Sequence, residues 1–146
     1  MRVAIIGLGA IAKKAYLPIL SAMEDVELLI STRNKKVLEE VSNKYKIDRA
    51  YNLLDNLLKE DFDAAIISTH ADGHYEIAKK LLEKGVNIYI DKPITYNLKT
   101  SIEIQELAKE KNLIAMVGFN RRFCPLVKKL KDKGKADIII MEKNRE

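Results

Sequence analysis

Six consecutive residues near the start of the chain have the types and spacing of a phosphate-binding turn: Gly7, Leu8, Gly9, Ala10, Ile11 and Ala12. Gly7 would allow a tight turn, and Gly9 has no side chain, so a pyrophosphate could approach the backbone there. Ala12 carries only a methyl group, which still allows a helix to pack closely on a strand. The alternative is a purely structural turn in another α/β fold, because many tight turns contain two glycines.

The residues on either side of this turn supply the elements that would position it. Residues 1–6 form an apolar, β-branched run of strand length, and residues 10–23 show helical spacing, with Pro18 kinking or shaping the helix. Strand, glycine turn and helix, in that order, are the context that the dinucleotide-binding fingerprint requires. In that context the free N–H groups and the positive dipole end of the helix face the phosphates.

The rest of the chain alternates between strands and helices. We predict further strands at 26–30, 50–51, 63–69, 86–90, 114–117 and 136–141, and helices at 35–45, 53–59, 74–84, 97–111 and 125–133. Because the strands are apolar throughout, both faces of the sheet are expected to be covered, which is typical of a doubly wound α/β domain with a parallel sheet. We predict six parallel strands, or nearly so, with the first three in the order 3-2-1 and right-handed crossovers.

Ligands of such folds bind beyond the carboxyl ends of the strands, so the residues that follow each strand are the candidate site. Besides the glycine turn, these segments are residues 31–34, 69–74, 91–95 and 118–122.

The segment after the second strand bears on the choice of cofactor. NAD-binding domains usually place an acidic residue there, about twenty residues beyond the glycines. This chain has Ser31, Thr32 and Arg33 instead. Arg33 can pair with a 2′-phosphate and stack on adenine, and the two hydroxyls can donate hydrogen bonds. These residues favour NADP(H) over NAD(H), unless Arg33 is merely a solvated residue that begins the next helix.

Composition excludes several other classes of function. The chain has 146 residues, which suits one domain, and its net charge of +5 comes from lysines interleaved with glutamates, so we expect solvated helix faces and no nucleic-acid partner. No apolar run is long enough to span a membrane, and the first strand begins almost at Met1, which leaves no room for a signal peptide. The single Cys124 fits a reducing compartment, so we expect a cytoplasmic protein. We assign no metal ligands.

Four segments together resemble the amino-terminal half of the Gfo/Idh/MocA oxidoreductases, NAD(P)-dependent enzymes that act on sugars, inositols and related polyols. The segments are residues 7–12, 68–74, 85–93 and 118–123. The third is similar to the family's Glu-Lys-Pro signature, with Asp91 in place of the glutamate. The fourth is similar to its Gly-Phe-Asn-x-Arg-Phe signature.

The resemblance implies roles for the residues that match these signatures. The lysine matching Lys92 orients the substrate and assists proton transfer near the nicotinamide, and the proline matching Pro93 commonly follows a cis bond that aims the lysine. Residues matching Thr69 and His70 line the nicotinamide side of the cleft, although His70 stands where the family usually has proline, which leaves its role open.

The resemblance leaves the roles of His74 and Arg122 open. His74 matches a histidine that is usual in the family at the start of a helix, and it either contacts a ligand or makes a local structural hydrogen bond. Arg122 either holds the loop of residues 91–93 or approaches the cofactor.

The family's members are more than twice as long as this chain. Their second half is an open, mostly antiparallel sheet that supplies most substrate contacts, the usual catalytic histidine and the main oligomer interface. We therefore assign residues 1–134 to a Rossmann-type dinucleotide-binding domain and residues 135–146 to the first strand of a substrate domain that this sequence lacks. That strand would fold onto the domain, pair between chains or stay disordered.

Three functions remain open. The chain is a dinucleotide-binding domain that binds NADP(H) without turnover, a small subunit whose site is completed by a separately encoded partner, or a non-catalytic nucleotide-sensing module. A sugar or polyol substrate is expected only where a carboxyl-terminal half is supplied, and a homo-oligomer is compatible with all three.

Overall fold

Six parallel strands form a single sheet in the computed structural model, which describes residues 1–134 and 142. The strands are β1 (Arg2–Ile6), β2 (Glu27–Ser31), β3 (Ala50–Tyr51), β4 (Ala64–Ile67), β5 (Asn87–Ile90) and β6 (Ala115–Val117). Their order across the sheet is β3-β2-β1-β4-β5-β6, so the strands after β1 are added first on one side of it, as far as β3, and then on its other side from β4 onward. This confirms the predicted parallel sheet and the 3-2-1 order of its first half.

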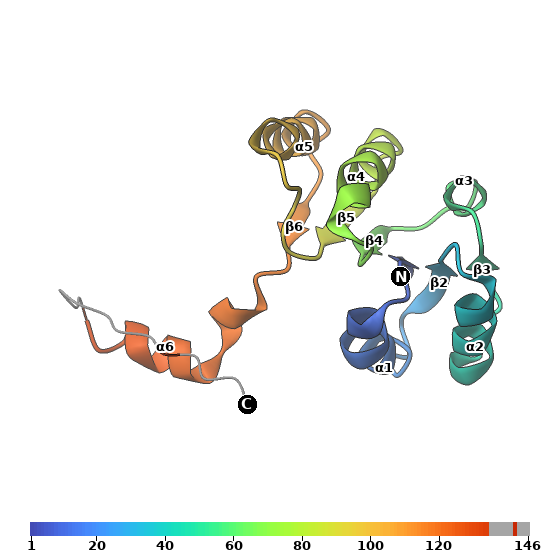
Figure 1. The fold of residues 1–146 in the computed structure, drawn as a ribbon, viewed down its shortest axis with the longest axis horizontal. Helices are drawn as coiled ribbons and strands as arrows, with labels where there is room; N and C mark the ends of the chain where they lie inside the picture. Colours follow the sequence, from blue (N-terminus) through green and yellow to red (C-terminus); the bar gives the residue numbers. More distant parts are fainter. Residues whose placement is uncertain (135–141, 143–146) are drawn as a thin grey trace.

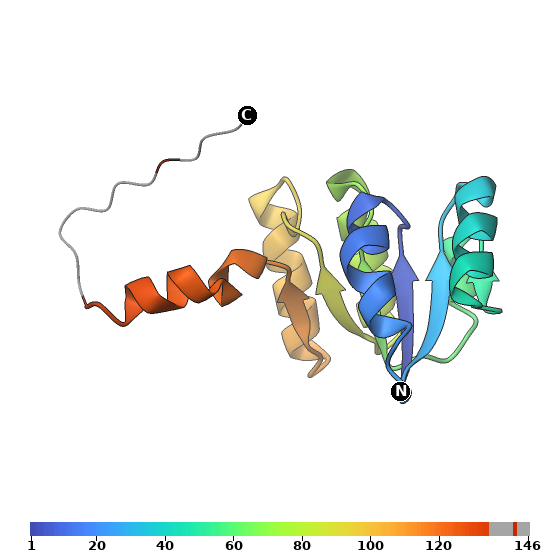
Figure 2. The ribbon, with the colours of Figure 1, turned by 90° about the horizontal axis from the view of Figure 1, so that it is seen from below.

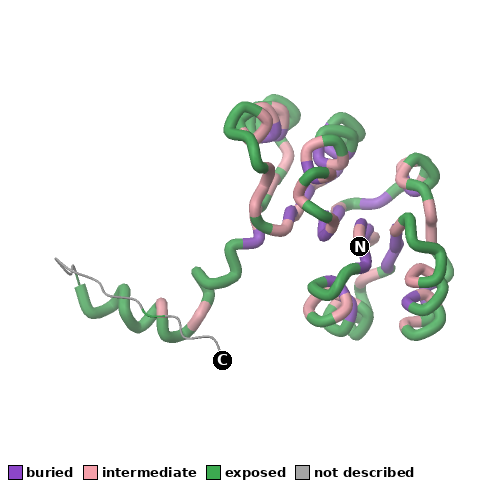
Figure 3. Tube along the Cα trace, in the orientation of Figure 1, coloured by how far each residue is buried: buried purple, intermediate pink, exposed green. Residues whose placement is uncertain are grey.

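Helices cover the sheet in two layers. Figure 1 shows α3 (Leu54–Leu57), α4 (His74–Glu83) and α5 (Leu98–Glu110) on one side, and α1 (Leu17–Leu20) and α2 (Lys35–Tyr45) on the other. Each layer has its own core, because alternate strand residues point to opposite faces. Ala4, Leu29 and Ile67 face the core under α3, α4 and α5, whereas Ile5 and Ile30 face the opposite core, where Val41 of α2 packs against them. Figure 3 shows that burial is concentrated in the strands and in the inner faces of these helices.

Beyond β6 the chain leaves the sheet. A short 3₁₀ turn (Asn120–Phe123) leads into α6 (Pro125–Lys131), which extends away from the other helices in Figures 1 and 2. No residue of α6 is buried. The strand predicted at 136–141 lies outside the described residues.

The first helix differs from a regular α-helix. Residues Ala12–Tyr16 form a π-helical turn, and α1 follows with Pro18 in its first turn. The N–H of Leu17 donates to the carbonyl of Ala12, five residues earlier. Proline has no N–H to donate to the turn before it, which accounts for an irregular turn at this point. The kink or reshaping expected at Pro18 is therefore observed as a π-turn that places Tyr16 directly before α1.

Candidate functional site

The turn after β1 contains two glycines: the fold requires glycine at position 7, and it leaves free space around Gly9. Gly7 has φ of +92°, and a Cβ there would lie 2.5 Å from the carbonyl oxygen of Ser68, so only glycine fits. Its N–H donates to the carbonyl of Ser31 at 2.8 Å. Gly9 is exposed, and a Cβ built on it would meet nothing within 4 Å. The backbone at Gly9 is therefore open to a ligand at the start of a helix.

The other residues of the turn divide between core and surface. Leu8 and Ala12 are buried, and Ala12 lies against the sheet with the core under α1. Ala10 and Ile11 are exposed beside Gly9. This pattern matches a turn whose inner residues pack on β1 and whose outer residues face a ligand.

Three candidate residues at the end of β2, whose last residue is Ser31, differ in accessibility. Ser31 is 3% exposed, Thr32 is half-buried and Arg33 is exposed. Asn34 caps α2, because its Oδ1 accepts the N–H of Val37 at 3.2 Å. Among the described residues no carboxylate pairs with Arg33, so its guanidinium is available to an anion at this edge of the sheet.

Two hydroxyl groups hold the carboxylate of Asp91 at the end of β5. Ser68 Oγ donates to one oxygen at 2.6 Å, and Tyr16 Oη donates to the other. Burial, and then the hydrogen bond to Asp91, raises the pKa of Tyr16 well above its usual range, so its hydroxyl stays protonated as a donor. The ring of Tyr16 meets Tyr89 edge-on, with 5.8 Å between the ring centroids.

Sequence reasoning missed Tyr16 and the hydroxyl of Ser68. Tyr16 lies four residues after Ala12, and that spacing places two helical residues on one face. Ser68 lies one residue before the predicted loop candidates. Neither signal identifies Asp91 as the shared acceptor, because the contacts join residues 75 and 23 positions apart.

The loop after Asp91 is held by a buried histidine. The Lys92–Pro93 peptide bond is cis, as the resemblance implied. His74 is 1% exposed, and its Nδ1 lies 2.9 Å from the carbonyl of Pro93 while its Nε2 lies 3.1 Å from the carbonyl of Thr69. Carbonyl oxygens only accept, so the ring tautomer decides which of the two carbonyls receives an N–H from His74. The structure shows the local contacts that were one of the two roles open for His74, and contact with a ligand stays a prediction.

The two histidines of the chain should therefore differ sharply in their effect on stability. His74→Ala removes a buried ring and leaves the carbonyls of Thr69 and Pro93 without that partner, so the free energy of unfolding should fall by about 2–4 kcal/mol. His70→Ala, at an exposed position four residues earlier, should change it by less than about 0.5 kcal/mol. Urea unfolding of the two variants measures the difference, and equal losses would contradict the assigned contacts.

Lys92 and Arg122 are both exposed at this edge of the sheet. No hydrogen bond or ion pair among the described residues joins the Arg122 side chain to the loop of residues 91–93, whose carboxylate is held by Tyr16 and Ser68. The structure thus brings the turn, Ser31, Thr69, His74 and the loop of residues 91–93 together, but it does not bring Arg122 onto that loop.

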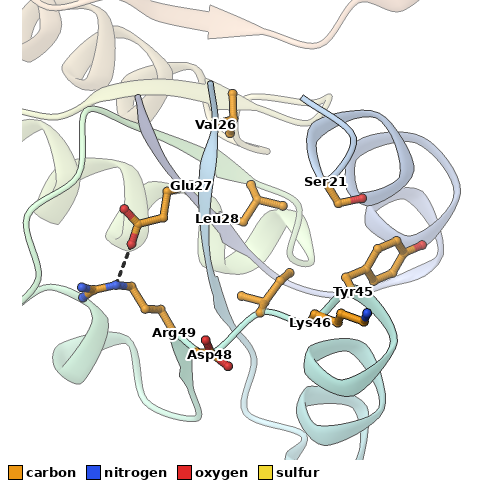
Figure 4. Close-up of a pocket in the computed structure, with 9 residues that line it drawn as sticks. Ser21, Val26, Glu27, Leu28, Tyr45, Lys46, Asp48 and Arg49 are labelled. Carbon is orange, nitrogen blue, oxygen red and sulfur yellow. Dashed lines mark ion pairs between the residues drawn. The ribbon is translucent and has the colours of Figure 1, made fainter. Parts of the chain in front are cut away.

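A separate hollow of about 290 Å³ lies at the opposite edge of the sheet (Figure 4). It is lined by the first residues of β2, by Ser21 and by the segment that follows α2. Arg49 Nε pairs with Glu27 Oε1 at 2.7 Å beside it. Because Glu27 begins β2 and the glycine turn follows the end of β1, this hollow is not the candidate site.

The described residues contain no gathering of three or more His, Cys, Asp or Glu side chains suited to a metal ion. None of the helices that the structure describes has the length and apolarity needed to cross a membrane.

Residues 1–119 match the Gfo/Idh/MocA family, which is described as an oxidoreductase family with an NAD-binding Rossmann fold. A putative oxidoreductase, YceM, from Salmonella typhimurium is 36% identical, and the match covers 99% of this chain and 47% of that protein. Myo-inositol 2-dehydrogenase from Thermotoga maritima is 29% identical, with 90% of this chain and 40% of that protein covered. This chain spans less than half the length of these relatives.

Solved structures agree with this match. A dehydrogenase (MviM) from Clostridium difficile superposes with a TM-score of 0.84 and 40% identity over 92% of this chain and 44% of that one. A Gfo/Idh/MocA family oxidoreductase from Vibrio cholerae gives a TM-score of 0.85 and 34% identity over 91% of this chain and 43% of that one. With the parallel sheet and the open glycine turn, these matches show that the chain belongs to the Gfo/Idh/MocA oxidoreductase family and carries its NAD-binding Rossmann domain.

Proposed function

We propose that the chain binds a nicotinamide dinucleotide across the turn of residues 7–12, with NADP(H) preferred over NAD(H). The observation that carries the proposal is the open backbone at Gly9, which begins a helix beside the point where the strand order reverses. The pyrophosphate would lie on Gly9, Ala10 and Ile11. The adenosine ribose would then lie at the end of β2, within reach of Thr32 and Arg33.

The cofactor preference depends on charge at the end of β2. Residues 31–34 contain no carboxylate, and Arg33 is exposed. A carboxylate at this point would repel a 2′-phosphate, whereas a guanidinium pairs with it. The fold itself does not decide the preference. A 3-ketoreductase from Actinomadura kijaniata of the same fold is described in complex with NADP, and an oxidoreductase from Agrobacterium radiobacter in complex with NAD⁺.

Arg33→Ala should remove most of the preference for NADPH and leave NADH binding almost unchanged. One exposed arginine–phosphate pair with neighbouring hydroxyl hydrogen bonds contributes about 1–3 kcal/mol, or roughly ten- to hundredfold in affinity. Lys111→Ala removes a positive charge at the end of α5 and is the matched control, with no expected change in the ratio. Fluorescence titration with both reduced cofactors measures the ratio, and an unchanged ratio in Arg33→Ala would refute the role of this residue.

The reaction we propose for the complete enzyme is hydride transfer between the nicotinamide and a hydroxyl of a sugar or polyol. Relatives that support this substrate class include the myo-inositol 2-dehydrogenase from Thermotoga maritima and a scyllo-inositol 2-dehydrogenase (NAD(+)) from Bacillus subtilis, which is 28% identical. In this chain Lys92 would orient the reacting hydroxyl and move its proton. Thr69 and His70 would line the nicotinamide side of the cleft.

This chain would bind the cofactor without turning over a polyol by itself. Residues 1–134 would form the cofactor domain, and residues 135–146 would begin the substrate domain of the longer relatives. A small subunit completed by a separate polypeptide is the alternative, and the exposed Lys92 favours it over a purely sensing module because the proton-transferring group is retained. The single cysteine of the chain, Cys124, fits a reducing compartment and so supports a cytoplasmic location.

A further inference from the structure

The Asp91 carboxylate joins three separate elements of the fold. Asp91 follows β5, Ser68 follows β4, and Tyr16 ends the π-helical turn that precedes α1. Each carboxylate oxygen accepts one hydroxyl hydrogen bond, from Ser68 at 2.6 Å and from Tyr16. Hydrogen bonds from hydroxyl groups to a carboxylate are among the strong ones in proteins, because the acceptor is charged.

These bonds hold the backbone immediately before Lys92. The N–H of Asp91 also donates to the carbonyl of Ile67 at 2.9 Å, which continues the pairing of β5 with β4. On the other side of Lys92, the Pro93 carbonyl is held by His74. Lys92 is therefore an exposed residue whose two neighbours are both tied down by side chains of other elements.

Tyr16 connects this loop with the turn of residues 7–12. The helix that carries it begins at that turn, where the N–H of Lys13 donates to the carbonyl of Gly9 at 3.0 Å. Tyr16 lies four residues after the buried Ala12 and is itself half-buried against Tyr89. The same helix thus presents its start to the proposed pyrophosphate and its Tyr16 hydroxyl to Asp91.

We propose that Tyr16 and Ser68 are positioning residues for Lys92, acting through the Asp91 carboxylate to fix the lysine relative to the helix that binds the cofactor phosphates. This inference rests on the proposed function, because a fixed position of Lys92 serves a purpose only if Lys92 takes part in the proposed reaction. Neither hydroxyl is expected to touch the cofactor or the substrate. Removing either one should loosen the Lys92 backbone without loosening the glycine turn.

The test measures the mobility of the Lys92 amide in the 146-residue chain by ¹⁵N relaxation, with and without NADP⁺. In the unmodified chain the order parameter of this amide should be near 0.85, as in rigid backbone. In Tyr16→Phe, which keeps the ring against Tyr89 and removes only the hydroxyl, it should fall below about 0.6. The amides of residues 8–12 should keep their values. Tyr45→Phe, in α2 away from Asp91, is the matched control and should leave Lys92 unchanged.

Ser68→Ala provides a second variant on the other carboxylate oxygen, and it decides the question if Tyr16→Phe does not fold. If the Lys92 amide loses order in a variant whose thermal midpoint stays close to that of the unmodified chain, the result supports positioning. A merely structural role would lower the thermal midpoint without a local change at Lys92. A rigid Lys92 in both variants, or a mobile Lys92 in the unmodified chain, would overturn the inference. Failure of the unmodified chain to bind NADP⁺ would overturn the proposed function instead, and the cofactor-free measurements would still decide the positioning.

Discussion

Gly9→Leu should weaken the binding of NADPH and NADH together by at least about a hundredfold, which corresponds to about 2.7 kcal/mol. A leucine side chain at this position would occupy the space that the proposal assigns to the pyrophosphate, which both cofactors share. The cofactor-free chain should tolerate the change, because a Cβ on Gly9 meets nothing within 4 Å. Calorimetric titration gives the affinities, and urea unfolding should show a stability close to that of the unmodified chain.

The first glycine of the turn, Gly7, shows what a loss of fold would require instead. Gly7 has φ of +92° and no room for a Cβ against Ser68, so a substitution there would perturb the structure itself. Gly9→Ala is the graded control, with a smaller loss of affinity than Gly9→Leu. If Gly9→Leu bound either cofactor as tightly as the unmodified chain does, the pyrophosphate would have to lie elsewhere.

Lys92→Ala should lower dehydrogenase turnover by about 10²–10⁴-fold in an assembly that contains both this chain and a polypeptide resembling the second half of its relatives, while NADPH binding persists. That range is typical of a lost general acid–base group. The isolated chain should show no measurable turnover, because residues 1–134, as the structure describes them, form no second wall to hold the substrate against the cofactor. Reduction of NADP⁺ with a panel of sugars and inositols measures both expectations.

Lys99→Ala, at an exposed position in α5, is the matched lysine control and should leave turnover unchanged. Robust turnover by the 146-residue chain alone would show that the residues of this domain are sufficient for the reaction. Turnover that survives Lys92→Ala in the complemented assembly would instead remove Lys92 from the reaction.

Local patterns were sufficient to predict the sheet. Apolar runs such as residues 63–69 alternate with helical periodicity, and the handedness of parallel crossovers leaves few orders for the strands. The observed boundaries are shorter at several ends, as in β4 (Ala64–Ile67), which ends before Ser68 although the N–H of Ser68 still donates to the carbonyl of Ile6. The turn of residues 7–12 was predictable because its two glycines stand between an apolar run of strand length and a segment with helical spacing.

The hydrogen bonds around Lys92 were not predictable, since they join residues that are distant in the sequence. Tyr16 and Asp91 meet only because β5 lies two strands from β1 and the π-turn before Pro18 sets the direction of the Tyr16 side chain. The partners of His74 were likewise not predictable, because only the folded chain brings the Thr69 and Pro93 carbonyls to its ring. The resemblance pointed to His74 and residues 91–93 as candidates but not to the hydrogen bonds that hold them.

Titration of the ¹⁵N-labelled chain with NADP⁺ and, separately, with NAD⁺ tests whether the cofactor binds across the turn of residues 7–12. We expect saturable one-to-one binding of both, with amide shifts concentrated at residues 7–12, 31–33, 91 and 92, and tighter binding of NADP⁺ by roughly ten- to hundredfold. No saturable binding, or shifts concentrated at the hollow beside Glu27 and Arg49, would contradict it.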